Sequence, residues 1–292
     1  MQLYAPAKIN LSLEIKGRRE DGFHEIETLM APISLADRLT IERANQETID
    51  FSCDDAALPP GEDNLVVRAA KLFEETTKTK FGLRISLEKK IPHGAGLGGG
   101  SSDAATTLLG LNELFGTGLS QKDLMELAAQ LGSDVPFFVA QAAAICRGRG
   151  EIVNPVKLPV ALRLLLMKPD FGVPTPSAYA RWKDSRELPG VDYAPQEFSG
   201  VRFTNDLERP VFEKFILLAH LKTWLRQQPE VGAALLSGSG STVFAVLRGG
   251  ADSNHLSARA REEIDPKLWI RSSTTVATPQ RSAADSRPRT RD

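Results

Sequence analysis

Alternating apolar and polar residues predict several β-strands in this chain. The clearest alternation runs from Phe81 to Glu88 and places Phe81, Leu83, Ile85 and Leu87 on one face. The same period occurs at residues 11–15, 39–42 and 48–52, and continuous apolar runs at residues 162–167 and 243–247 predict strands buried on both faces. A large part of the core should therefore be β-sheet.

Helical spacing and capping residues mark the segments between these strands. Asn64 precedes apolar residues at helical spacing as far as Phe73, and Ser120 with Asp123 forms a capping box. Further helices are expected at residues 101–115, 175–182 and 211–228, and Ser133–Pro136 opens a helix or a tight turn. Strands and helices follow no strict βαβ order, which favours an α+β fold over a doubly wound sheet.

The composition narrows the classes of function. The 292 residues are 41% apolar and 25% charged, with a formal net charge of −1, so nucleic acid is not an expected partner. No apolar run reaches the roughly 18 residues of a membrane span, and charges interrupt the first twenty positions, so we expect no signal peptide. Cys53 and Cys146 form no metal or redox motif. These features favour a cytoplasmic protein with reduced thiols.

The strongest candidate for chemistry is a glycine-rich loop between a predicted strand and a predicted helix. Five of the seven residues from Gly94 to Gly100 are glycine, which lets the backbone approach a ligand closely. Because the loop leads into a helix N-terminus, its N–H groups and the helix dipole should bind an anion such as a triphosphate. Ser101 and Ser102 add hydroxyls for phosphate oxygens or magnesium, and Asp103 lies in the first helical turn.

Three phosphate-binding patterns compete for this loop. The P-loop pattern requires lysine where Gly100 stands, so it fails. The dinucleotide pattern matches Gly94, Gly96 and Gly99, but it expects a second parallel strand where a helix from Ser120 follows. The pattern P-x-[GA]-x-G-L-G-[GS]-[GS]-S-[SDA] fits residues 92–102 closely. It resembles the phosphate loop of the galactokinase, homoserine kinase, mevalonate kinase and phosphomevalonate kinase (GHMP) superfamily.

Two further side chains complete a possible phosphoryl-transfer site. Lys8 lies in or beside the first strand and, taken alone, could be an edge lysine in water. Asp134 precedes Val135-Pro136 and, taken alone, could be a helix N-cap. Together with the loop they offer a base for the acceptor hydroxyl and a cation for the transition state.

Four segments resemble one family in particular. They are Pro6–Leu11, Gly17–Leu29, the glycine loop and Leu131–Phe138, and they look like those of the 4-diphosphocytidyl-2-C-methyl-D-erythritol kinases. The similarity covers about residues 1–250, and Asp21–His24 is its most specific part. The resemblance implies ATP-dependent phosphorylation of the 2-hydroxyl of the cytidyl-linked methylerythritol in non-mevalonate isoprenoid biosynthesis. Another GHMP kinase, of homoserine or mevalonate type, or a non-catalytic nucleotide-binding regulator, is the alternative.

The resemblance also implies roles for particular residues. Lys8 and Asp134 are the expected catalytic pair, and ATP with Mg²⁺ the expected cofactors. Phe23 and Tyr179 should stack on the cytosine, with His24 at the base edge, although Phe23 or His24 could instead be structural. The expected ATP-binding residues are His93, Gly94, Ala95, Gly96, Leu97, Gly98, Gly99, Gly100, Ser101, Ser102 and Asp103, and Asn10, Gly238, Ser239 and Gly240 complete the substrate-binding set. Residues 237–242 could also be only a tight turn.

The family fold supplies the expected architecture. It has two lobes, an N-terminal lobe like the second domain of ribosomal protein S5 and a ferredoxin-like C-terminal lobe, with the site in the cleft between them. We expect domains at residues 1–155 and 156–278, a disordered polar tail at 279–292, and a monomer or homodimer. Tyrosine is common in the family where this chain has Phe23, and the tail matches no family segment.

Overall fold

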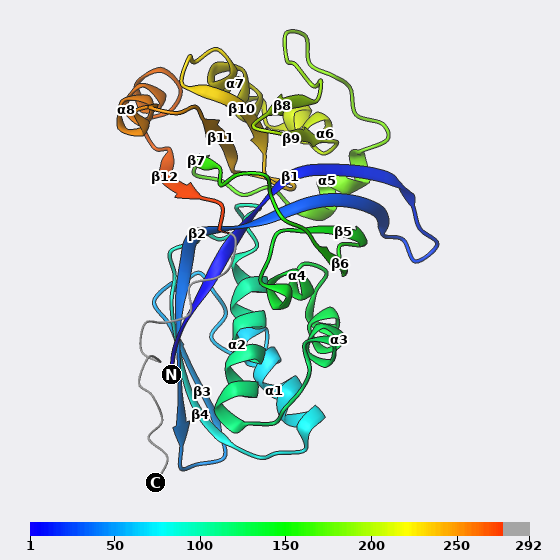
Figure 1. The fold of residues 1–292 in the computed structure, drawn as a ribbon, viewed down its shortest axis with the longest axis vertical. Coiled ribbons are helices and arrows are strands. Elements are labelled where there is room, and N and C mark those ends of the chain that lie inside the picture. The colour runs from blue at the N-terminus through cyan, green and yellow to red at the C-terminus, as the bar shows by residue number, and fades with distance from the viewer. Residues whose placement is uncertain (277–292) are drawn as a thin grey trace.

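Two long antiparallel strands, β1 (Gln2–Arg18) and β2 (His24–Ala44), rise from the lower part of the molecule and bend toward one side at about half its height (Figure 1). The computed structural model describes residues 1–276. The register of β1 and β2 shifts at three points, between Pro6 and Lys8, between Asn10 and Ser12, and between Ile15 and Gly17. Such irregularities bend a strand pair. The bend separates the lower half of the molecule in Figure 1, here called the lower lobe, from the upper half, the upper lobe.

The first sheet is built around this pair and has the strand order β3-β4-β2-β1-β9-β8, with β5 pairing with β2 and β6 with β5. Its other strands are β3 (Ile49–Cys53), β4 (Gly82–Glu88), β5 (Ala144–Gly148), β6 (Ile152–Pro155), β8 (Gln196–Phe198) and β9 (Val201–Asn205). Helices α1 (Leu65–Thr77), α2 (Gly99–Phe115), α3 (Gln121–Leu131) and α4 (Val135–Ala140) pack together against it (Figure 1).

The helix starts follow the predicted capping chemistry. The Asn64 side chain accepts a hydrogen bond from the Val66 N–H, and Ser120 and Asp123 form the reciprocal capping box of α3. The helix predicted at residues 211–228 is wrong in one respect, because it is two helices, α6 (Glu208–Lys214) and α7 (Ile216–Arg226). Phe215 leaves the helical conformation between them and stacks on the Phe171 ring with centroids 5.4 Å apart.

The second sheet is antiparallel and has the order β10-β11-β7-β12. Its strands are β7 (Arg163–Lys168), β10 (Val231–Leu236), β11 (Val243–Leu247) and β12 (Trp269–Thr274), and the upper lobe also holds α5 (Thr175–Arg181) and α8 (Ser253–Glu263). One face packs on α6, α7 and α8. The opposite face packs on β1, so that one cluster of buried residues contains side chains from both sheets.

The burial of β1 on both faces determines where its polar side chains Lys8 and Asn10 lie. Ala7, Ile9 and Leu11 point into the core between β1 and the second sheet. Because successive side chains of a strand point to opposite faces, Lys8 and Asn10 point the other way. Both are nonetheless buried, with Lys8 only 4% exposed, since β1 is covered on both faces here.

The architecture confirms the expected two-lobed α+β fold. Strands β8 and β9 come from the second half of the chain, yet β9 pairs with β1 of the first sheet through Leu13 and Asn205. The domain bounds at residues 155 and 278 stay predictions, and the tail expected at 279–292 lies outside the described residues.

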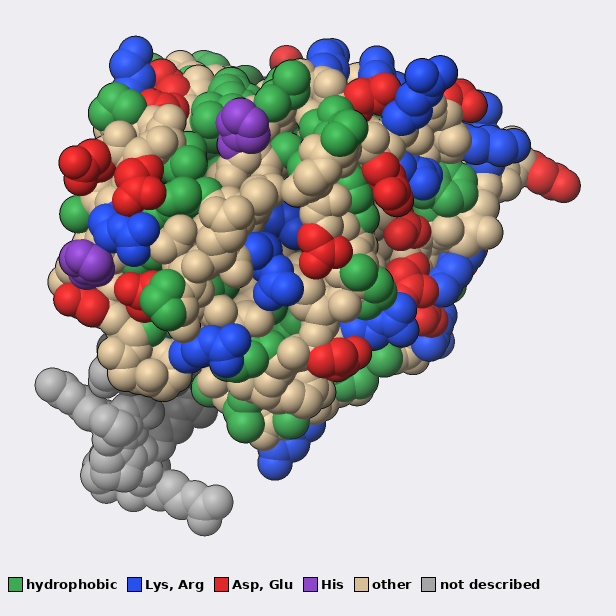
Figure 2. Space-filling view, turned by 90° about the horizontal axis from the view of Figure 1, so that it is seen from above, with side chains coloured by type: hydrophobic (Ala, Val, Ile, Leu, Met, Phe, Trp, Pro, Cys, Tyr) green, Lys and Arg blue, Asp and Glu red, His purple; other side chains and the backbone are tan. Residues whose placement is uncertain are grey.

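The distribution of charged side chains on the surface agrees with the net charge of −1. On the face shown in Figure 2, Lys and Arg side chains are interspersed with Asp and Glu. Within residues 1–276, no helix is long and apolar enough to cross a membrane.

Candidate active site

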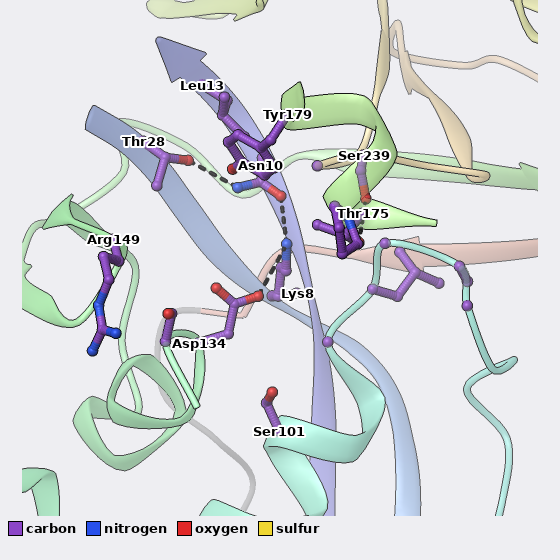
Figure 3. A pocket seen from close by; sticks show the side chains of 18 of the residues that line it. Lys8, Asn10, Leu13, Thr28, Ser101, Asp134, Arg149, Thr175, Tyr179 and Ser239 are labelled. Carbon is purple, nitrogen blue, oxygen red and sulfur yellow. Dashed lines mark hydrogen bonds and ion pairs between the residues drawn. The ribbon is translucent and has the colours of Figure 1, made fainter. Parts of the chain in front are cut away.

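A cavity of about 920 Å³ opens where the two lobes meet. Residues from β1, the glycine loop, the start of α4, helix α5 and the loop between β10 and β11 line it. Figure 3 shows the centre of this cavity, with Lys8, Asp134 and Ser101 pointing toward a shared space. A volume of this size accommodates a small-molecule ligand.

The glycine loop has a conformation that requires glycine at alternate positions. Gly94, Gly96 and Gly98 have φ values of 64°, 72° and 70°, which L side chains rarely adopt. A Cβ on Gly96 would lie 2.2 Å from the Ser237 carbonyl oxygen, and one on Gly98 would lie 3.0 Å from Lys8 Cγ. The glycines therefore let this loop pack directly against both the second glycine loop and Lys8.

The loop ends at the N-terminus of α2, which carries no side-chain cap. Gly98 is the N-cap residue, and Gly99, Gly100 and Ser101 of the first turn line the cavity. The first N–H groups of a helix have no partner within the helix. Unpaired N–H groups and the positive end of a helix dipole attract anions, and this 17-residue helix directs both at the cavity.

Two predicted ATP-loop residues do not line the cavity. Ser102 and Asp103 are buried, 0% and 2% exposed, because the helical turn rotates them away from the opening that Ser101 faces. Ser102 Oγ and Asp103 Oδ1 have no hydrogen-bond partner in the described structure. Direct contact between these two side chains and a ligand in the cavity, as predicted, is therefore not what the structure presents.

Asp103 belongs instead to a buried ionic cluster with Lys89 and Asp37. Lys89 Nζ lies 2.8 Å from Asp103 Oδ2 and also donates to Asp37 Oδ2, while Asp37 Oδ1 accepts from the Ile91 N–H at 2.8 Å. Burial, with the charge of Asp37, raises the pKa of Asp103 to about 7, against the opposing effect of Lys89. The cluster fixes the start of α2 to the end of β4, and Lys89 also reaches the cavity wall.

Lys8 and Asp134, the predicted catalytic pair, lie next to each other in the cavity. Lys8 Nζ lies 3.6 Å from Asp134 Oδ2, and the Asp134 side chain is 36% exposed (Figure 3). Asp134 is the N-cap residue of α4, yet its side chain makes no capping hydrogen bond. Its carboxylate is therefore available to a ligand, and Lys8 is a buried cation rather than an edge lysine in water.

A short hydrogen-bond chain holds Lys8 in place. Lys8 Nζ donates to Asn10 Oδ1 at 2.5 Å, Asn10 Nδ2 donates to Thr28 Oγ1 at 2.8 Å, and Thr28 Oγ1 donates to the Ser12 carbonyl at 2.5 Å. The last link fixes the direction of the Asn10 amide. The Lys8 ammonium has three N–H groups, so two remain for Asp134 and a ligand.

The second glycine loop, Ser237–Thr242, closes the cavity from the upper lobe. Its Ser237 Oγ donates to the Gly96 carbonyl at 3.0 Å, and its Thr242 N–H donates to the Ala95 carbonyl at 3.1 Å. Of the three predicted substrate residues in it, Gly238 and Ser239 line the cavity. Gly240 does not, because it turns back against Leu236 and Val173.

The predicted cytidine residues gather at one end of the cavity, in a different arrangement from the one expected. The His24 ring, not Phe23, lies against Tyr179, with centroids 5.3 Å apart, and Trp182 meets His24 edge-on at 6.0 Å. Phe23 is 50% exposed, so it is not a core aromatic, and the Arg149 guanidinium lies 4.7 Å from its centroid. Burial raises the pKa of the Tyr179 phenol and, with the Arg18 charge, lowers the pKa of His24.

Several cavity residues were not identified from the sequence. Lys89, Arg149, Trp182 and Lys183 all line the cavity. Arg149 lies in the segment Arg147-Gly-Arg-Gly150, which ends β5 and begins the turn to β6. A Cβ on Gly150 would lie 3.6 Å from Asp134 Oδ1, so the β5–β6 turn lies beside Asp134. Gly148 and Gly150, which mark a turn, were the feature of the sequence that could have led to Arg149.

The described residues hold no preformed metal centre. Within residues 1–276, no three His, Cys, Asp or Glu side chains lie close enough together to hold a metal ion.

Comparisons with known proteins agree with the geometry. The family model described as GHMP kinases N terminal domain matches residues 64–142. A 4-diphosphocytidyl-2-C-methyl-D-erythritol kinase of Methylacidiphilum infernorum is 43% identical over 271 residues, covering 92% of this chain and 94% of that protein. The kinase of the same name from Bacillus cytotoxicus is 41% identical over 251 residues, covering 83% and 86%.

Solved structures extend the similarity. A crystal structure of 4-(cytidine 5'-diphospho)-2C-methyl-D-erythritol kinase matches with a TM-score of 0.76 and 37% identity, covering 94% of this chain and all of that one. Homoserine kinase from Cytophaga hutchinsonii matches with a TM-score of 0.68 and 18% identity, covering 96% of this chain and 95% of that one. At that identity the homoserine kinase shares the fold alone.

Proposed function

This chain belongs to the 4-diphosphocytidyl-2-C-methyl-D-erythritol kinase family of GHMP small-molecule kinases, and we propose that it phosphorylates the 2-hydroxyl of 4-diphosphocytidyl-2-C-methyl-D-erythritol. ATP is the phosphoryl donor, and the reaction belongs to non-mevalonate isoprenoid precursor biosynthesis. One observation carries the proposal: Lys8 and Asp134 face each other in the same cavity that the N-terminus of α2 enters.

The donor binds at the first glycine loop. The N–H groups of residues 94–101 and the positive end of α2 hold the β- and γ-phosphates, so the γ-phosphorus points toward Lys8 and Asp134. Ser101 adds a hydroxyl from the first turn. Because phosphoryl transfer requires little covalent chemistry from the protein, this positioning supplies much of the rate.

Asp134 acts as the base. Its carboxylate takes the proton of the acceptor hydroxyl, the alcohol oxygen bonds to the γ-phosphorus, and the bond from that phosphorus to the β–γ bridging oxygen breaks. The products are the phosphate monoester and ADP. A carboxylate is a weak base, so orientation by Lys8 at 3.6 Å and charge stabilisation on the transferring group must contribute strongly.

The acceptor spans the cavity from its aromatic end to the catalytic pair. Phe23, His24 and Tyr179 bind the cytosine, with the exposed Phe23 ring as a stacking surface and His24 at the base edge. Asn10 and Gly238 lie beside Lys8, where the methylerythritol must present its hydroxyl, and Ser239 lines the same cavity. The predicted Gly240 contributes through the turn rather than by contact.

Magnesium fits the site as a partner of the nucleotide. Mg²⁺ usually keeps several waters and binds through substrate phosphates with one or two protein oxygens. Ser101 presents a hydroxyl oxygen to the cavity and would hold the ion together with the phosphates. When bound, the ion neutralises charge on the phosphates.

A substrate panel tests the proposal. ATP consumption should be rapid with the cytidyl substrate and at least ~10²-fold slower in kcat/KM with the cytidine-free sugar phosphate, because remote binding energy is then lost. Phosphorylation of homoserine or mevalonate without turnover of the cytidyl substrate would contradict the proposal. Its cytoplasmic location and its state as a monomer or homodimer stay predictions.

A further inference from the structure

One buried amide that does not line the cavity binds the start of the second glycine loop, in addition to the bonds that Ser237 and Thr242 make to the first loop. Asn205 is the last residue of β9 and is 6% exposed. Its Nδ2 donates to the carbonyls of Leu236 and Gly238, each at 2.8 Å. Its Oδ1 accepts from the Leu207 N–H at 2.9 Å, so the orientation of the amide is fixed.

The bonded carbonyls bracket the point where β10 ends and the loop begins. Leu236 is the last residue of β10, and Gly238 is the second residue of the loop, with a φ of 55°. An amide has two N–H groups, and Asn205 uses both on this short segment. The position of Gly238 therefore depends on Asn205 more directly than on the regular pairing of the sheet.

Gly238 in turn packs against the catalytic lysine. A Cβ on Gly238 would lie 3.2 Å from Asn10 Oδ1 and 3.4 Å from Lys8 Nζ. A shift of this loop would move its backbone into or away from the two atoms that share the 2.5 Å hydrogen bond. Asn205 is also tied to β1 itself, because its backbone pairs with Leu13.

We infer that Asn205 is a positioning residue that sets the distance between the second glycine loop and the Lys8 ammonium, and that this distance controls turnover. It acts through Gly238 and does not touch substrate. The inference rests on the proposed function, since it assigns to Lys8 its role in phosphoryl transfer.

The chain offers a matched control in Gln196. This amide is 7% exposed, donates through Nε2 to the Ala234 carbonyl at 2.8 Å and accepts from the Ala234 N–H at 2.9 Å. It lies on β8, beside β9, and binds the same strand β10 two residues before Leu236. Gln196→Ala therefore removes a similar set of buried hydrogen bonds to β10 without affecting the bonds that hold the second glycine loop.

The experiment compares Asn205→Ala with Gln196→Ala. Both should lower Tm by a similar amount, roughly 2–8 °C. Asn205→Ala should lower kcat about 10²-fold, the scale of a 1 Å misplacement, while an ATP analogue binds within about 3-fold of the native affinity. Gln196→Ala should keep kcat within about 3-fold. Asn205→Asp, which keeps the shape but places an oxygen against two carbonyls, should lose turnover as Asn205→Ala does.

A second readout does not need the acceptor. Amine labelling followed by mass spectrometry should show Lys8, 4% exposed in the native protein, reacting at least ~3-fold faster in Asn205→Ala and unchanged in Gln196→Ala. If the native protein fails to turn over the cytidyl substrate, the proposed function fails while the labelling still decides the loop inference. If Asn205→Ala does not fold, Asn205→Ser gives the same comparison with one donor retained. Equal effects of both clamps on turnover and labelling, or native turnover in the Asn205 variants, would overturn the inference.

Discussion

The contact between the two glycine loops makes a quantitative prediction for Gly96→Ala. The new Cβ would lie 2.2 Å from the Ser237 carbonyl oxygen, and a tolerable separation is near 3.2 Å, so the loops must part by about 1 Å. The change also places alanine at a φ of 72°, which costs about 1–2 kcal/mol.

The parting should break the bonds between the loops. These are Ser237 Oγ to the Gly96 carbonyl and the Thr242 N–H to the Ala95 carbonyl. At about 1 kcal/mol each, their loss adds about 2 kcal/mol to the strain. Gly96→Ala should then destabilise the protein by about 3–4 kcal/mol.

Gly94→Ala is the control, because it carries the strain without the clash. Gly94 has a φ of 64°, and its Cβ would meet only the Gly172 Cα, at an ordinary 3.6 Å. It should cost about 1–2 kcal/mol. Thermal unfolding without nucleotide should therefore show Gly96→Ala melting roughly 4–8 °C below Gly94→Ala. Equal Tm values would refute the claim that the two loops pack backbone to backbone.

Three further predictions follow from the site. Asp134→Asn should lower kcat by about 10²–10⁴-fold while isothermal titration shows near-native binding of an ATP analogue, and native turnover would remove Asp134 as the base. Burial and the Arg18 charge lower the pKa of His24, so the imidazole should be neutral at pH 7 and become charged only at a pH below the usual histidine range. The KM for the cytidyl substrate should therefore rise as the pH falls, and His24→Gln should lose that rise. The same rise of KM in the variant would exclude His24 as its cause. Burial raises the pKa of the Cys146 thiol to about 12, so a disulfide reagent at pH 8 should modify Cys146 only after denaturation, and rapid modification of the native protein would contradict its burial.

The sequence predicted the parts of the fold that local chemistry determines. The alternating strand at Phe81–Glu88 and the caps at Asn64 and Ser120 follow directly from residue spacing, and the structure confirms them. The break at Phe215 coincides with stacking on Phe171, which is distant in the chain. A periodicity argument could not find it.

In the candidate site, too, some features could be predicted from the sequence and others depend on contacts between distant residues. The glycine loop and the pairing of Lys8 with Asp134 could be predicted because a family pattern links them. The ionic cluster that surrounds Asp103 could not, because it depends on Lys89 bonding to Asp37, over fifty residues away in the chain. Nor could spacing show that His24 rather than Phe23 would lie against Tyr179.

The account depends most on where the acceptor hydroxyl and the γ-phosphate meet. A crystal structure with a non-hydrolysable ATP analogue and the cytidyl substrate measures this directly. The γ-phosphate should lie at the N-terminus of α2, and the substrate 2-hydroxyl should lie within about 2.6–3.2 Å of an Asp134 carboxylate oxygen. A hydroxyl bound away from Asp134, or a γ-phosphate held elsewhere than at residues 94–101, would contradict the account.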